Sequence, residues 1–297
     1  MSRYICVDIG GTSIKHGVLN ENAIIEESNQ TKTEAWLGGA EVLDKVKAIG
    51  KQYMEQYENI EGICISTAGM VDPEEGKIVF AGELMPDYTG TCIKKELEKT
   101  LGIPCEVEND VNCAGLAEYI SGAAKESHIM FCATVGTGIG GCAIVDGSVF
   151  HGASNSACEI GYIPMEDSDF QTLGASSILI KKVAGKKREP LDMWDGKKIF
   201  ELAEKGDEVC ISAIKEMCDV LGKGLATICY VLNPDIIVLG GGVMAQKKFL
   251  ENEIIDSLKR YLKPILAEHL QVCFAEYGNE AGMVGALYNF QNKCGRK

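Results

Sequence analysis

The sequence lacks any apolar run long enough to span a bilayer. Its first residues, MSRYICVDIGG, also have neither the basic stretch nor the apolar core of a signal peptide. We therefore predict a cytoplasmic protein without a membrane partner. Histidine is scarce: the 4 histidines stand far apart, and the 13 cysteines include no Cys-x-x-Cys pair. We expect no structural zinc ion, and we expect the cysteines to be reduced and mostly buried.

Basic residues are also in the minority. The chain has 29 Lys and Arg against 43 Asp and Glu, for a formal net charge of -14. Because Lys and Arg displace counterions when a protein binds a nucleic-acid backbone, this charge argues against DNA or RNA as a partner. A nucleotide stays possible, since main-chain N–H groups and a metal ion can offset its charge locally. The composition is otherwise that of a folded protein, and 297 residues favour two domains.

One pattern of strand, glycine turn, strand and tight turn occurs twice. It appears in YICVD, the Gly10–Gly11 pair and SIKHGVL, and it returns in IMFCATV, GTGIGG and CAIV. Helices are predicted around residues 40–57, 93–101 and 111–120, and a long one at 214–232 that the sequence NPD ends. The repeat predicts a duplicated α/β domain.

Three glycine-rich turns follow predicted strands. Glycine lets main-chain amides approach a phosphate closely, because it has no Cβ atom and positive φ is accessible to it. Around the first turn, Asp8 offers a carboxylate for Mg²⁺ through water, and Thr12 offers a hydroxyl for a phosphate oxygen. A plain hairpin turn is the alternative for Gly10–Gly11. The second turn contains G-x-G-x-x-G, as in NAD-dependent oxidoreductases, but here a β-hairpin follows it instead of a helix.

Acidic residues also lie at the ends of two other segments. Glu108-Asn109-Asp110 ends a predicted strand, where Asp110 can act as a base in phosphoryl transfer or merely cap the next helix. Glu159 follows a Ser/Asn/Gly-rich loop and is either held at the edge of a site or solvated. Gly69 ends a strand among small residues, which suits the close approach of a ligand.

Several ordered motifs together resemble the sugar kinases of the ROK family (repressor, open reading frame, kinase). They are DIGGTSIK, VENDVNCAGLAE, VGTGIGGCAI, HGASNSACEIGY, VLGGGV and EAGMVGAL. The resemblance implies two ribonuclease-H-like lobes of the hexokinase, Hsp70 and actin superfamily, with a cleft between the lobes. We expect an N-terminal lobe at 1–118, completed by a C-terminal helix at about 281–297, and a C-terminal lobe at 119–280. A homodimer is common among similar kinases and is expected here.

The resemblance also implies roles for individual residues. ATP and Mg²⁺ are the expected cofactors, and a small sugar is the expected substrate. The sugar is expected to contact Gly69, Asn109, Asp110, Glu159 and Tyr162, with Asp110 as the catalytic base. The ATP-binding residues are expected to be Asp8, Gly10, Gly11, Thr12, Lys15, Thr134, Gly136, Thr137, Gly138, Gly240, Gly241 and Gly242.

The chain departs from the family pattern at one segment. Many members have EIGH, whose histidine binds zinc with a cysteine-rich segment, but here the residue is Tyr162 and no cysteine follows nearby. A second sugar-facing glutamate of the family is replaced at about Thr172. This variant is similar to the β-glucoside kinases of the family, which act on the 6-hydroxyl of a terminal glucose.

Other functions stay open on sequence grounds. The chain could phosphorylate fructose or an N-acyl amino sugar such as N-acetylmannosamine, or it could bind a sugar without chemistry. The family's repressors carry a DNA-binding segment ahead of the kinase-like body, and we expect none here. The sequence therefore predicts an ATP-dependent kinase for glucose or a β-glucoside such as cellobiose.

Overall fold

The computed structural model describes residues 1–294, which form two compact units. Unit 1 contains Met1–Gly122, the loop Val149–Ala157 and the described part of the segment from Asn279 onward. Unit 2 contains Ala123–Ser148 and Cys158–Gly278. The chain therefore leaves unit 1, returns to it for one short loop, and returns again for its last helix.

Unit 1 is built on a five-stranded sheet with the order β3-β2-β1-β4-β7. The first three strands form two antiparallel hairpins, as predicted, whereas β4 and β7 run parallel to β1. A small antiparallel hairpin, β5–β6, follows β4. The strands are β1 (Arg3–Ile9), β2 (Ser13–Asn20), β3 (Ile25–Lys32), β4 (Ile60–Thr67), β5 (Met70–Asp72), β6 (Lys77–Phe80) and β7 (Cys105–Asn109).

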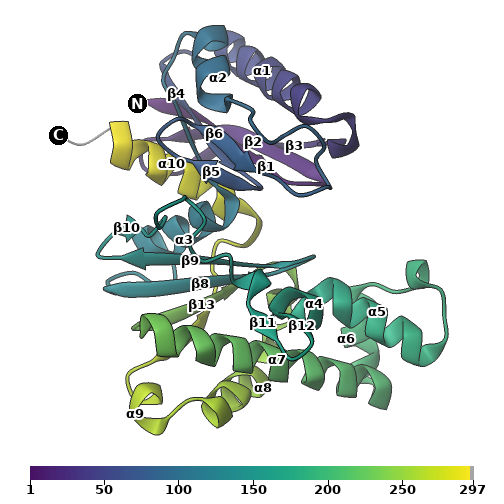
Figure 1. Ribbon diagram of the computed structural model, residues 1–297. Coiled ribbons are helices and arrows are strands. Elements are labelled where there is room, and N and C mark those ends of the chain that lie inside the picture. The colour runs from purple at the N-terminus through teal and green to yellow at the C-terminus, as the bar shows by residue number, and fades with distance from the viewer. Residues whose placement is uncertain (295–297) are drawn as a thin grey trace. The chain divides into compact units, whose positions relative to one another are not determined.

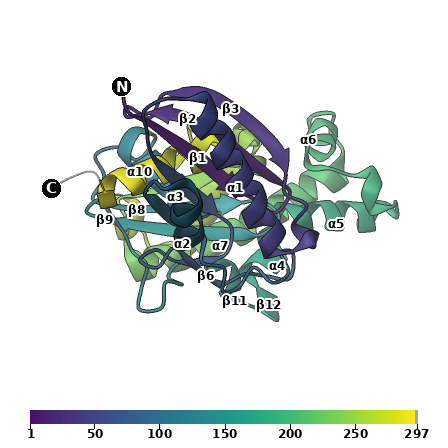
Figure 2. The ribbon, with the colours of Figure 1, turned by 90° about the horizontal axis from the view of Figure 1, so that it is seen from above.

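Helices cover both faces of this sheet (Figure 1). Helices α1 and α2 lie on one face and share its apolar core, while α3 and α10 pack against each other on the other face (Figure 2). Gly102 ends α2 in the left-handed conformation, as the sequence predicts. These helices are α1 (Gly39–Gln56), α2 (Ile93–Leu101), α3 (Asp110–Ser121) and α10 (Ala281–Cys294).

Two glycines let α10 lie unusually close to its neighbours. A Cβ atom at Gly282 would overlap the carboxyl of Asp8, and one at Gly285 would overlap the main chain of Cys113. The EAGMVGAL motif is therefore a packing motif. It brings the last helix against the ends of β1 and α3.

Unit 2 repeats the sheet with the order β10-β9-β8-β13-β14. Strands β8 and β9 are antiparallel, and β13 runs parallel to both β8 and β14. The duplication predicted from the two strand-and-turn patterns is thus confirmed. The strands are β8 (Ile129–Val135), β9 (Ile139–Val145), β10 (Ser148–Val149), β11 (Pro164–Met165), β12 (Ser168–Asp169), β13 (Ile236–Gly240) and β14 (Gln271–Phe274).

The long helix α7 packs against α8 beneath this sheet (Figure 1). It ends before Asn233, which takes a left-handed conformation at the predicted break. The β11–β12 hairpin and helices α4 to α6 form a segment that no sequence pattern predicted. The helices are α4 (Phe170–Gly174), α5 (Ser176–Lys187), α6 (Gly196–Glu204), α7 (Glu208–Leu232), α8 (Lys247–Tyr261) and α9 (Pro264–Ala267).

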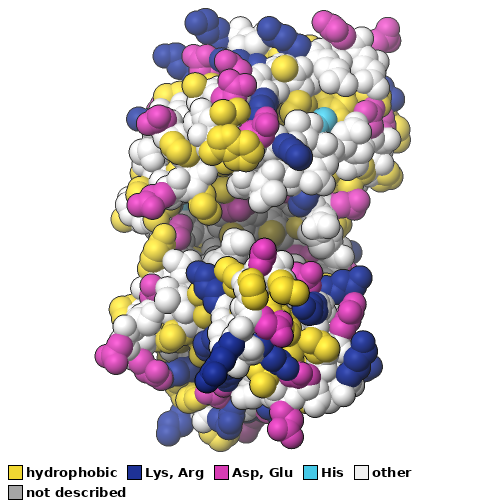
Figure 3. Space-filling model, turned by 90° about the vertical axis from the view of Figure 1, so that its right-hand side faces the viewer, with side chains coloured by type: hydrophobic (Ala, Val, Ile, Leu, Met, Phe, Trp, Pro, Cys, Tyr) yellow, Lys and Arg dark blue, Asp and Glu magenta, His cyan; other side chains and the backbone are white. Residues whose placement is uncertain are grey.

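On the face drawn in Figure 3, Lys and Arg side chains lie among Asp and Glu side chains. Most of the 13 cysteines are buried. None of the helices within residues 1–294 combines the length and the apolar character that a bilayer crossing requires.

Candidate active site

The carboxyl edge of the first sheet carries the candidate acidic residues. Strands β1, β4 and β7 are parallel, so Asp8, Thr67 and Asn109 end at the same edge, where ligands of open α/β sheets bind. Asp8 accepts a hydrogen bond from Ser66 Oγ at 2.7 Å, and Lys15 Nζ lies 3.6 Å from its second oxygen. Lys15 also donates to the carbonyl of Asn279 at 3.1 Å, just before α10.

Hydrogen bonds hold the main chain of the first glycine turn in place, while the residues at its tip are exposed to solvent. The amide of Gly10 donates to Ser13, and Thr33 binds the turn through its hydroxyl to Gly10 and its amide to Thr12. Gly11 and Thr12 are exposed, and a Cβ atom at Gly11 would meet nothing. This turn offers open space in front of Gly11, and among the glycines of the three turns only Gly241 has positive φ.

Asp110 begins α3 but does not cap it. The N-cap is Asn109, whose Oδ1 accepts from the amides of Val111 at 2.9 Å and Asn112 at 3.1 Å. Asn109 Nδ2 donates to the carbonyl of Gly69 at 2.9 Å and to Asp110 Oδ1 at 3.0 Å. Because Asn109 performs the structural task, the capping role that the sequence left open for Asp110 is not needed.

Gly69 lies beside this junction and must be glycine. Its φ is +99°, and a Cβ atom would lie 2.9 Å from the carbonyl oxygen of Phe80. Its own carbonyl is the acceptor for Asn109. The structure thus brings together Gly69, Asn109 and Asp110, three of the five predicted sugar contacts.

The sequence did not indicate two further side-chain contacts near Asp110. Tyr88 is buried, and its hydroxyl lies 2.8 Å from Thr67 Oγ1. Burial raises the pKa of the Tyr88 phenol, and the charge of Asp110 raises it further. Glu108 is fully buried and lies 2.8 Å from His151 Nε2. These contacts join distant parts of the chain, so no local pattern could have found them.

The second glycine turn lies at the start of α5 in unit 2. Ser176 Oγ donates to Gly136 O at 2.6 Å, and Ser177 Oγ donates to Thr137 O at 2.7 Å. The Gly136 amide is bonded to Gly138 O across the turn. Two serines of a helix that the sequence did not predict thus hold the turn in place.

The third glycine turn lies next to the second. Gly240 pairs with Thr134 in the parallel ladder of β13 and β8. At Gly241 φ is +94°, and a Cβ atom there would overlap the main chain of Val135. Thr134 and Gly240–Gly242 therefore lie side by side at the carboxyl edge of the second sheet.

Glu159 is the N-cap residue of the short 3₁₀ helix η2 (Ile160–Tyr162) of the same unit, and Tyr162 is the last residue of that helix. Burial raises the pKa of Glu159, and its carboxylate has no hydrogen-bond or ion-pair partner in the part of the chain that the structure describes. Tyr162 is 56% exposed. The Glu159 carboxyl is thus only partly hydrated and is available to a ligand.

Gln171 is a polar neighbour that the sequence did not indicate. Its Oε1 lies 2.8 Å from the position of a Cβ atom at Gly138 and 3.0 Å from that at Gly161. Thr172 is exposed, and its amide is bonded to the N-cap residue Asp169 at 2.7 Å. The side chain that lies between the second glycine turn and η2 is therefore Gln171.

Protein ligands for a metal ion are limited. Within residues 1–294, no three His, Cys, Asp or Glu side chains come close enough to hold a metal. Asp8 could still contribute one carboxylate to a hydrated Mg²⁺, which usually keeps several waters and takes few protein ligands.

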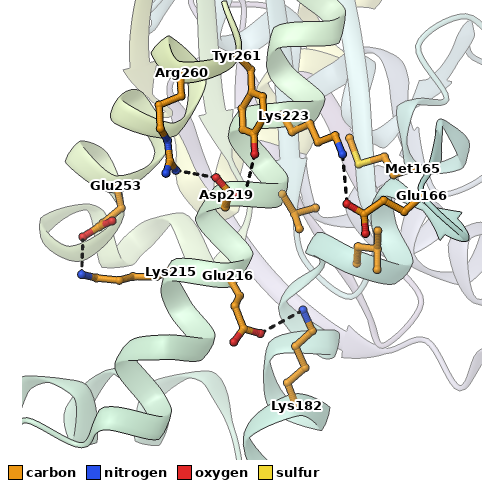
Figure 4. A pocket seen from close by; sticks show the side chains of 12 residues that line it. Met165, Glu166, Lys182, Lys215, Glu216, Asp219, Lys223, Glu253, Arg260 and Tyr261 are labelled. Atoms are coloured by element: carbon orange, nitrogen blue, oxygen red, sulfur yellow. Dashed lines mark hydrogen bonds and ion pairs between the residues drawn. The ribbon is translucent and has the colours of Figure 1, made fainter.

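Unit 2 also has a pocket of about 660 Å³ between α5, α7 and α8. Figure 4 shows its acids and bases facing one another. The ion pairs that line it are Lys182–Glu216, Lys215–Glu253, Lys223–Glu166 and Arg260–Asp219. Since each cation in this pocket already faces an acid, the pocket is a poor match for a phosphate group.

The chain is similar to known proteins over nearly its whole length. The ROK family pattern matches residues 4–293. A β-glucoside kinase of Klebsiella pneumoniae is 31% identical, over 95% of this chain and 94% of its own length, and an uncharacterized protein of Clostridium perfringens is 45% identical over 98% of each chain. The crystal structure of a ROK family glucokinase from Streptomyces griseus, in complex with glucose and AMPPNP, has a TM-score of 0.84 at 28% identity, covering 97% of this chain and 98% of that one.

The fold and the similar proteins show that the chain is an ATP-dependent sugar kinase with the α/β fold of the hexokinase, Hsp70 and actin superfamily. The chain belongs to the ROK family.

Proposed function

We propose that the chain transfers the γ-phosphoryl group of ATP to the 6-hydroxyl of glucose or of a β-glucoside, with Asp110 as the general base. The observation that carries this proposal is the hydrogen bonding of Asp110. Its carboxylate lies in the first turn of α3 and accepts from Asn109 Nδ2 and the Val111 amide, each at 3.0 Å. These donors and the helix N-terminus stabilise the ionised form, which is the form that can accept a proton.

The reaction needs little else from the protein than alignment and charge neutralisation. As the sugar oxygen bonds to the γ-phosphorus, the bond from that phosphorus to the bridging oxygen breaks and ADP leaves. Asp110 takes the proton of the attacking hydroxyl. In the proposed arrangement Asn109, Gly69 and Glu159 hold the sugar, while Gly10–Thr12, Lys15, Thr134, Gly136–Gly138 and Gly240–Gly242 contact the nucleotide. Mg²⁺ near Asp8 would neutralise phosphate charge.

The proposed sugar class rests on the segment after Glu159. Where many family members bind zinc, this chain has the exposed Tyr162, the β11–β12 hairpin and α4. Thr172 is exposed as well. An aromatic ring and a short hydroxyl side chain leave more room at the anomeric end of the sugar than a zinc-bound loop with a second carboxylate.

The test is an ADP-release assay over glucose, cellobiose, aryl β-glucosides, fructose and N-acetylmannosamine. Phosphorus NMR of the product would identify the phosphorylated hydroxyl. We expect 6-phosphates of glucose and of at least one β-glucoside. Good turnover of glucose without cellobiose or aryl β-glucosides would reject the sugar class, and the absence of ATP-dependent turnover on every sugar would favour a protein that only binds sugars.

A further inference from the structure

A histidine of the loop Val149–Ala157 has no role in the proposed function. The structure groups this loop with unit 1, although the chain on both sides of it belongs to unit 2. The loop closes on itself: the Ala157 amide donates to His151 O at 3.1 Å, and Gly152, with φ of +71°, has its Cβ position 3.0 Å from the Ala157 methyl. This compact turn holds His151 next to Glu108 within unit 1.

The partner of His151 is a carboxylate with no exposure to solvent. Glu108 has 0% of its surface exposed, and its Oε2 lies 2.8 Å from His151 Nε2. Its other oxygen accepts from the Asn109 amide at 2.7 Å and from Asn112 Nδ2 at 2.9 Å. A buried carboxylate is tolerated only when donors satisfy it, so His151 supplies the donor for one of the two oxygens.

The hydrogen bonds of Glu108 connect through Asn109 to Asp110, the proposed base. Glu108 holds the Asn109 amide and Asn112, while Asn109 caps α3 and donates to Asp110 Oδ1. We propose that His151 is a positioning residue that holds Asp110 in its reactive orientation through Glu108 and Asn109. This inference rests on the proposed role of Asp110 as the base.

Loss of the donor at position 151 would leave Glu108 Oε2 buried without a partner. Glu108 would then rotate towards another donor, and this change weakens its hold on Asn109 and Asn112. A shift of about 1 Å at a reacting group can lower the rate about 100-fold. The effect should fall on kcat, because the nucleotide contacts proposed above do not include this network.

The experiment compares His151→Gln with His151→Met in the full-length protein. The two side chains are nearly equal in shape, but only glutamine keeps an N–H donor near the position of Nε2. We expect H151M to lower kcat about 10- to 100-fold with little change in KM for ATP, and H151Q to stay within about threefold of the parent. H128Q and H128M are the matched controls, since His128 is exposed and lies 3.3 Å from Asp146, and neither should change kcat.

The double variant H151M/D110N tests whether His151 acts through Asp110. If His151 acts through Asp110, H151M should lower the residual rate of D110N no further, because the base is already missing. Equal losses in H151Q and H151M, unchanged kcat in H151M, or additive losses in the double variant would each overturn the proposal. If H151M does not fold by circular dichroism, H151N takes its place, since its shorter amide does not reach Glu108.

The D110N single variant separates the two proposals. Full turnover in D110N contradicts the general base itself. A large loss in D110N with normal turnover in H151M contradicts only the role of His151.

Discussion

The two sheets have the same strand order, but different kinds of residue lie at their carboxyl edges. In unit 1, β1 ends next to Asp8 and β7 leads into Asn109 and Asp110. At the corresponding edge of unit 2, β8 contains Thr134 and β13 ends on Gly240. Both copies of the scaffold thus carry a glycine turn and a threonine at this edge, but the carboxylates Asp8 and Asp110 lie only at the edge of the first sheet. We infer that proton transfer belongs to unit 1 and that unit 2 supplies much of the nucleotide contact.

The largest expected effect tests this division directly. D110N should lower kcat about 10²- to 10⁴-fold with little change in thermal midpoint, because a general base is lost and the cap at Asn109 remains. T134V should instead raise KM for ATP about tenfold, as expected for the loss of one hydrogen bond. Steady-state kinetics with both variants measures the two effects. D44N on the exposed part of α1 is the control. The division fails if T134V lowers kcat as much as D110N does.

A second comparison concerns the segment of unit 2 from β11 to α6. Phe170 is 1% exposed, and a Cβ atom at Gly224 of α7 would overlap its ring, so α4 is anchored by an apolar side chain. F170A should reduce the free energy of unfolding by about 3 to 5 kcal/mol, measured by denaturant titration. F150A, which alters a half-exposed ring, should change it little. A small effect of F170A would mean that the segment is held in some other way.

Two helix glycines, Gly282 in unit 1 and Gly185 in unit 2, provide a third comparison of the units. G282A should lower activity, because the added methyl overlaps the Asp8 carboxyl. G185A in α5 meets no atom within 4 Å and should stabilise the protein by about 0.5 to 1 kcal/mol. Enzyme assays and thermal melts distinguish the two. Normal activity in G282A would show that the position of Asp8 is not critical.

The smallest expected effect is a pH dependence at Glu159. Burial raises the pKa of this carboxyl in the folded state. Its contribution to stability is therefore present below the unfolded pKa and is lost as the pH rises through the folded pKa. E159Q should match the parent protein in thermal midpoint near pH 4 and exceed it at pH 7, while binding sugar more weakly. E75Q on an exposed turn is the control. A midpoint difference that does not change with pH would contradict this assignment.

Much of the scaffold could be predicted because its signals are local. The strand-and-turn repeat, the stop at Gly102 and the break after Leu232 each depend on neighbouring residues. The insertion from β11 to α6 could not be predicted, because its short elements are defined by caps and by packing against α7. The shape of the first glycine turn could not be predicted for a similar reason, because it depends on contacts such as that of Thr33 with Gly10.

The amino-acid sequence by itself determined the duplicated α/β scaffold, the family and the candidate residues at the strand ends, because these follow from local periodicity and ordered motifs. Only the tertiary structure decided that Asn109 caps α3 in place of Asp110. It also decided that Gln171 lies against the second glycine turn, and that His151 binds Glu108. Each of these contacts depends on where distant segments meet, and a hydrogen bond between residues 43 positions apart leaves no periodic trace in the sequence.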